Sequence, residues 1–167
     1  NLNAKGSGTL DQARLDHLRW TSPQGDLDLR GTWSRTTPIQ TTLQGHDLDL
    51  EALGSLLRLP EIRGTRANVQ AQLKGPQSRV MLRRADQWQA SVLVALTQNG
   101  REAGGLAASL DRGQATLDHV RLDLDALKLE GRGWATLDAR GLGQFEGAGE
   151  AALDANQVGR ALQAWQI

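Results

Sequence analysis

The sequence predicts a mainly β protein: one antiparallel sheet, strongly curved or folded over into a groove, with two short amphipathic helices. Apolar and polar residues alternate with a period of two along much of the 167-residue chain, as in strands with one apolar and one hydrated face. Nineteen glycines against four prolines indicate many turns and bulges. If the strands average about 5–6 residues, the sheet would hold roughly nine to twelve strands.

The first clear alternation lies in residues 25–31, GDLDLRG, where two leucines face one way and two aspartates the other. Residues 121–125, RLDLD, repeat it with leucines against aspartates. Residues 67–75, ANVQAQLKG, show it most fully. Their predicted apolar face holds Ala67, Val69, Ala71 and Leu73. Each of these segments therefore predicts a strand that is covered on one side only.

The segment from Trp88 to Gly100 differs, because it is apolar on both faces between Val92 and Leu96. That pattern predicts a more central strand. It ends at Asn99-Gly100, a pair that suits the two positive-φ positions of a type I′ hairpin turn.

Two segments follow helical spacing instead. Each opens on an aspartate that can serve as the N-cap, in residues 49–59 and 154–165. We expect these helices to cap the ends of the groove. The side chains predicted to pack against the sheet are Leu53, Leu56 and Leu57 in the first helix and Val158 and Leu162 in the second.

The chain also contains a predicted internal repeat of about one hundred residues, with units at residues 9–60 and 111–167. The segment Leu15-Asp16-His17 recurs as Leu117-Asp118-His119. Insertions between the copies fall in predicted turns, as in diverged structural duplications. Farther along, the matching pairs are Leu27 with Leu127, Leu29 with Leu129, Gly31 with Gly131, and Trp33 with Trp134, which we expect at equivalent places.

Composition excludes several functional classes. The 19 basic and 19 acidic residues give a net charge of zero, which argues against a nucleic-acid surface. No apolar run approaches the length of a membrane-spanning helix. The absence of cysteine removes disulfides and thiolate chemistry, and weakly favours an oxidising compartment such as the periplasm.

No catalytic or metal-binding constellation is found, and no cofactor is expected. His17 and His119 each follow an aspartate, but neighbours on a strand point to opposite faces, so a strand-end role is predicted instead of a dyad. His46 has no Glu or His at metal spacing. The acidic alternations lie along strands and lack a calcium-binding loop. Phosphate-binding and dinucleotide-binding glycine patterns are absent. The residue patterns by themselves therefore name no reaction.

The candidate site is the apolar side of the sheet. Every second residue of a strand shares a face, and we predict one continuous concave surface, with glycines such as Gly31, Gly75 and Gly131 at strand ends permitting the bend. The predicted groove residues are Leu27, Leu29, Val69, Ala71, Leu73, Val92, Val94, Leu122, Leu124, Leu127 and Leu129.

Residues 42–76 carry a family resemblance: a strand, a glycine, Asp-Leu, a short leucine-rich helix, an Arg-Gly turn, an alternating strand, then Gly-Pro. This order resembles the AsmA-like family of bacterial envelope proteins, especially its long periplasmic YhdP type and, more distantly, the TamB type. Residues 127–165 resemble the same module. The hairpin between the two modules, from Trp88 to Leu124, is also similar to the family.

The resemblance implies a non-enzymatic role in the periplasm of a Gram-negative bacterium. The resemblance also implies a long curled sheet, whose apolar groove carries phospholipid acyl chains between the inner and outer membranes. The chain, which starts at Asn1, would be a piece of a longer protein. A segment outside this piece would anchor it in the inner membrane, and an outer-membrane partner is possible.

Two other interpretations stay open. The sheet could be a scaffold for protein–protein contacts in outer-membrane protein assembly, without lipid conduction. Its apolar side chains could also simply pack on one another and on the two helices.

Overall fold

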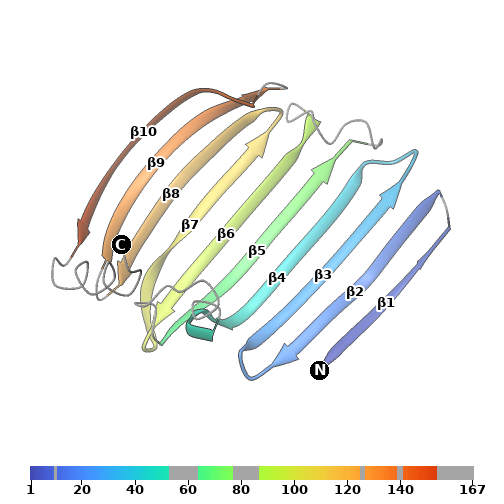
Figure 1. Cartoon of the computed structure of the whole chain (residues 1–167), viewed down its shortest axis with the longest axis horizontal. Coiled ribbons are helices and arrows are strands. Elements are labelled where there is room, and N and C mark those ends of the chain that lie inside the picture. Colours follow the sequence, from blue (N-terminus) through green and yellow to red (C-terminus); the bar gives the residue numbers. More distant parts are fainter. Residues whose placement is uncertain (10, 53–63, 77–86, 125–126, 139–140, 154–167) are drawn as a thin grey trace, which may run out of the picture.

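A computed structural model describes residues 1–9, 11–52, 64–76, 87–124, 127–138 and 141–153. They form one sheet of ten antiparallel strands that follow each other in chain order (Figure 1). Because β1 and β10 stand at the two ends of this order, they are the edges of the sheet that the described strands form. The strands are β1 (Leu2–Gly8), β2 (Gln12–Ser22), β3 (Gly25–Ser34), β4 (Ile39–Asp49), β5 (Thr65–Gly75), β6 (Gln89–Gln98), β7 (Arg101–Asp111), β8 (Gln114–Leu124), β9 (Leu127–Asp138) and β10 (Gly141–Leu153). The predicted mainly β antiparallel class is confirmed.

Two-residue turns join several of these strands. Asn99 and Gly100 connect β6 to β7 with φ values of 51° and 78°, which confirms the predicted turn with two positive-φ positions. Arg112 and Gly113 connect β7 to β8 in the same way, with φ values of 48° and 87°. Because such turns match the twist of antiparallel strands, each strand folds back directly beside its predecessor.

The strand register sorts side chains onto two faces across the whole sheet. Paired residues of antiparallel strands share a face. One continuous row of pairs links six strands through Leu29, Leu43, Ala71, Val92, Ala108 and Leu117. The adjacent row on the opposite face runs through Asp28, Gln44, Gln70, Leu93, Ala107 and His119. We call these the apolar face and the polar face.

The strand predicted to be central, β6, lies in the middle of the strand order. It is not covered on both sides, however. Leu93 lies on the polar face and is 49% exposed. Apolar residues on both faces of a strand therefore did not indicate burial on both faces here.

The most buried side chains gather at one end of strands β4 to β7. Apart from glycines, the buried residues within the described ranges are Leu48, Thr65, Ala67, Gln98 and Ala103. The accessible surface of the chain is 11990 Å², whereas a compact monomer of this mass has about 8,000 Å². The single-layer arrangement of the described strands contributes to this difference, because its faces stay open to solvent.

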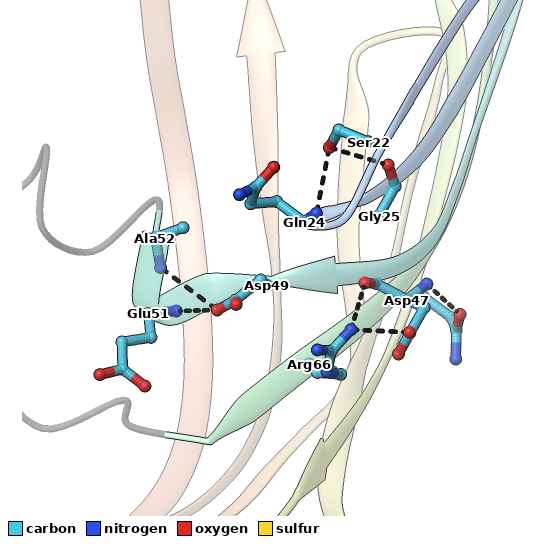
Figure 2. Close-up of polar contacts among 9 residues, drawn as sticks. Ser22, Gln24, Gly25, Asp47, Asp49, Glu51, Ala52 and Arg66 are labelled. Atoms are coloured by element: carbon cyan, nitrogen blue, oxygen red, sulfur yellow. Dashed lines mark hydrogen bonds and ion pairs between the residues drawn. The ribbon is translucent and has the colours of Figure 1, made fainter. Parts of the chain in front are cut away.

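This buried end includes an irregularity in β4 (Figure 2). Asp47 adopts a φ of 53° within a bulge, and its N–H donates to Asn68 Oδ1 at 3.0 Å. Arg66 Nη1 donates to Asp47 Oδ2 at 2.7 Å. The bulge turns Leu48 onto the apolar face, where Gly45 leaves room for it: a Cβ on Gly45 would lie 2.7 Å from Leu48 Cδ1.

A helix begins directly after β4, and residues 50–52 are described in it. Asp49 Oδ1 accepts hydrogen bonds from the N–H groups of Glu51 and Ala52, at 2.9 and 3.2 Å (Figure 2). The predicted N-cap is therefore confirmed. The apolar helix residues Leu53, Leu56, Leu57, Val158 and Leu162, and the whole second predicted helix, lie outside the described residues.

The two Leu-Asp-His segments form β-bulges at corresponding places. In β2, Leu15 pairs with Gly31 and Leu18 with Leu29, so two residues oppose Arg30 alone. In β8, Leu117 pairs with Gly133 and Val120 with Gly131, so two residues oppose Arg132 alone. The extra residue relative to the preceding strand is Asp16 in the first case and Asp118 in the second.

The predicted alignment within the repeat is wrong in this hairpin. The bulges and strand starts of β2–β3 and β8–β9 correspond at a constant separation of 102 residues. Trp33 consequently corresponds to Ala135, and not to Trp134. Trp33 pairs with Ala13 on the apolar face, whereas Trp134 pairs with Thr116 on the polar face. The remainder of the predicted repeat units stays a prediction.

Two further expectations need correction. His17 and His119 lie within strands at the bulges, and not at strand ends. Gly31 and Gly131 likewise lie within β3 and β9, while Gly75 does end β5. Gly75 serves a steric purpose there, because a Cβ at this position would collide with the indole of Trp88.

Candidate functional site

The apolar face is the candidate site, and the predicted groove residues with described side chains all belong to it. They come from five strands that the register brings together: Leu27 and Leu29 in β3, Val69, Ala71 and Leu73 in β5, Val92 and Val94 in β6, Leu122 in β8 and Leu129 in β9. Leu124 and Leu127 pair with each other beside the β8–β9 turn. The side chains of these two residues are not among those that the structure describes.

The register adds members that the alternation did not identify. They extend the apolar face into β2, β4 and β7 and fill its centre in β8: Leu15, Leu18, Trp20, Leu43, Leu106, Leu110, Leu117 and Val120. Leu15 and Leu18 are three residues apart, as are Leu117 and Val120. In a regular strand, residues three positions apart lie on opposite faces. The bulges place both members of each pair on the same face.

Large side chains on this face shield one another without being covered. Leu27, Leu29, Val69 and Val92 are half-buried, and Leu73 is 38% exposed. At the β10 edge Phe145 is 74% exposed. Because the described residues provide no second layer over most of these side chains, the face leaves apolar surface available to another molecule.

Charge is almost excluded from the apolar face. Its described paired positions between β2 and β9 hold one charged residue, Arg101, which pairs with Gln98 at the β6–β7 turn. Ion pairs lie on the polar face instead, where Arg30 contacts Asp28 at 2.8 Å and Lys128 contacts Asp123 at 3.1 Å. The separation of charge from apolar surface follows directly from the period-two alternation.

Two hollows in the described surface are lined mainly by polar-face side chains. One of about 720 Å³ lies over β8 to β10 and includes His119, Arg121, Glu130, Arg132 and Glu150, all from the polar face. A second, of about 460 Å³, is lined largely by polar-face side chains at one end of β4 to β7. The predicted concave form of the apolar face therefore stays a prediction.

The described polar side chains form no cluster typical of a metal site. Within the described ranges, no group of three His, Cys, Asp or Glu residues is placed to hold a metal ion. His17 Nε2 lies 3.4 Å from Asn3 Oδ1, and Asp16 contacts Arg14 at 2.7 Å. The described geometry of the apolar face supports non-directional contact with apolar groups.

Comparison of the chain with models of known families, with curated proteins and with solved structures gives no match. None of the helices in the described part is long and apolar enough to cross a membrane.

Proposed function

We propose that this chain is a periplasmic module of an AsmA-like envelope protein, and that its apolar face shelters phospholipid acyl chains moving between the inner and outer membranes. The observation that carries the proposal is the continuous apolar face, which runs through consecutive strands with one charged residue at its margin between β2 and β9. The role is non-enzymatic. In this proposal a segment outside these 167 residues anchors the protein in the inner membrane.

The dimensions of the sheet suit such a ligand. Ten strands have nine intervals, and at about 4.8 Å per interval the sheet spans about 43 Å along its hydrogen-bonding direction. An acyl chain gains about 0.8 kcal/mol for each CH₂ removed from water. A twelve-carbon stretch would therefore gain about 10 kcal/mol before its ordering entropy is subtracted.

Sliding requires that no single position hold the ligand tightly. Aliphatic side chains such as Leu29, Leu43 and Val92 offer contact without directional bonds, so neighbouring positions along the row have similar affinity. A charged head group would gain nothing from this face and would stay in water at its margin. These properties favour acyl-chain conduction over tight binding of one whole lipid.

The test uses two neighbouring residues of β5 that face opposite ways. Val69→Arg places a charge on the apolar face, and Gln70→Arg places the same side chain on the exposed polar face. We expect phospholipid, measured by extraction and mass spectrometry, to co-purify with the parent and with Gln70→Arg. Val69→Arg should lose most of it while keeping the circular dichroism spectrum of a sheet.

Each failure has a distinct meaning. A folded Val69→Arg variant that retains lipid like the parent would exclude the apolar face as the conduit. A Val69→Arg variant that does not fold would show that Val69 belongs to an ordinary core. A parent that carries no lipid, alone or after incubation with phospholipid vesicles, would contradict the proposal directly.

The second candidate function is a β-scaffold for protein contacts in outer-membrane protein assembly. It is favoured by the two sheet edges, β1 and β10, which have no described neighbour on their outer sides. A lipid-free parent that captures an extended peptide at an edge strand would support the scaffold.

A further inference from the structure

The two edges of the sheet carry opposite charge. β1 contains one charged residue, Lys5, and all its residues are exposed. β10 contains two, Glu146 and Glu150, which are also exposed. Lys5 pairs with His17 of β2, and Glu146 and Glu150 pair with Trp134 and Glu130 of β9, so all three belong to the polar face. An edge strand presents unpaired N–H and C=O groups to any further strand.

These charges disfavour the two symmetric ways of joining copies of the chain. Pairing β1 with β1 would bring Lys5 near its own equivalent, and pairing β10 with β10 would bring four glutamates together. Like charges on adjacent strands are destabilising. Pairing β1 of one copy with β10 of another brings Lys5 towards Glu146 and Glu150, so the edges select the head-to-tail arrangement.

Because the number of strands is even, a second copy can add head to tail with its apolar face on the same side as that of the first copy. Neighbouring strands alternate in direction and the sheet holds ten, so β1 and β10 run in opposite directions. A second copy placed beside β10 in the same orientation therefore offers its β1 antiparallel to β10. The β1 strand of the second copy then takes the place of an eleventh antiparallel strand. The apolar faces of the two copies form one continuous surface.

The side-chain pattern fits the same pairing. On the apolar face β1 presents Leu2 and Ala4, and β10 presents Phe145, two glycines and Ala151. From Phe145 onwards, the polar-face residues of β10 are even-numbered. A register in this part of β10 that places Leu2 and Ala4 on the apolar face therefore sets Lys5 opposite an even-numbered residue. Opposite Ala148, Lys5 has Glu146 and Glu150 as its two diagonal neighbours, at a distance that long side chains can span.

We infer that β1 and β10 are complementary docking surfaces for a second copy of this chain, which adds head to tail and extends the apolar face. Such a contact is heterologous, so it gives dimers and then longer open assemblies with rising concentration. The inference goes beyond the proposed function and does not depend on lipid.

The test reverses charge on one edge at a time and measures mass by sedimentation velocity over a range of concentrations. Lys5→Glu and the double variant Glu146→Lys/Glu150→Lys each change exposed polar-face residues, and circular dichroism checks their folding. We expect each variant alone to associate at least about tenfold more weakly than the parent, because attractive cross-strand pairs become repulsive. An equimolar mixture should recover the parent's association, since each variant then meets a complementary edge.

Other modes of association give different results. Symmetric β1–β1 or β10–β10 dimers would be left intact by each charge reversal alone. Stacking of two apolar faces would be unaffected by either variant and by mixing them. Either result, or a parent that stays monomeric throughout, would overturn the head-to-tail inference, whereas the outcome of Val69→Arg on lipid would be unaffected.

Discussion

Asp16 and Asp118 occupy the same place in two β-bulges that lie 102 residues apart. Each is the residue without a counterpart on the preceding strand, and each bulge lies opposite an arginine, Arg30 or Arg132, on the following strand. The flanking aliphatic residues then return to the apolar face. The repeated Leu-Asp-His segment is thus a repeated irregularity of the sheet.

Deleting Asp118 should convert β8 into a regular strand. Leu117, His119 and Val120 would then alternate correctly against β7 and β9, and no side chain would change face. We expect the free energy of unfolding, measured by urea denaturation, to change by less than about 1 kcal/mol.

Deleting Thr116 is the matched control, because it also shortens β8 by one residue. If His119 and Val120 keep their partners after this deletion, Leu117 takes the place of Thr116 and Asp118 takes the place of Leu117. Leu117 then lies on the polar face and Asp118 on the apolar face. We expect a loss of roughly 2–4 kcal/mol from these two misplacements. Equal losses for both deletions would show that the bulge residue is not dispensable.

Gly75 should be intolerant of a side chain because the indole of Trp88 fills the space of its Cβ. We expect Gly75→Ala to lower the unfolding free energy by about 1–3 kcal/mol through overpacking. Gly31→Ala is the control, since its Cβ would meet its nearest atom at 3.3 Å. Combining Gly75→Ala with Trp88→Ala should cost less than the sum of the two single changes; strict additivity would argue against the contact.

Leu48 and Leu93 should differ sharply in their contribution to stability. Leu48 is 8% exposed at the buried end of the apolar face, and Leu93 is 49% exposed on the polar face. We expect Leu48→Ala to cost about 2–5 kcal/mol, and Leu93→Ala less than about 1 kcal/mol. A larger loss at Leu93, measured by thermal denaturation, would mean that the polar face is covered.

Removing the helix cap should weaken the chain locally after β4. Asp49→Ala deletes the acceptor used by the N–H groups of Glu51 and Ala52, and we expect a loss of about 0.5–2 kcal/mol. Asp49→Ser keeps a capping oxygen and should retain most of the stability. If both variants melt alike, the cap contributes little, and hydrogen exchange at Glu51 and Ala52 should then also be unchanged.

Several features of this protein could be predicted from the sequence because they depend on neighbouring residues. Period-two alternation placed Val69 and Ala71 together on one face, since alternate residues of any extended strand point the same way. Asn99-Gly100 specified its turn because both residues tolerate positive φ. Asp49 specified the helix start because its side chain reaches N–H groups two and three residues ahead.

Tertiary structure alone decided which strand residue lies opposite which. The bulges at Asp16 and Asp118 exist only relative to the partner strands, so a spacing of three between Leu15 and Leu18 could not be recognised as one face. Trp33 and Trp134 look equivalent in the sequence, yet the paired register puts them on opposite faces. A shift of one residue exchanges the faces of a strand, and that shift is set by contacts between strands, which a linear pattern does not contain.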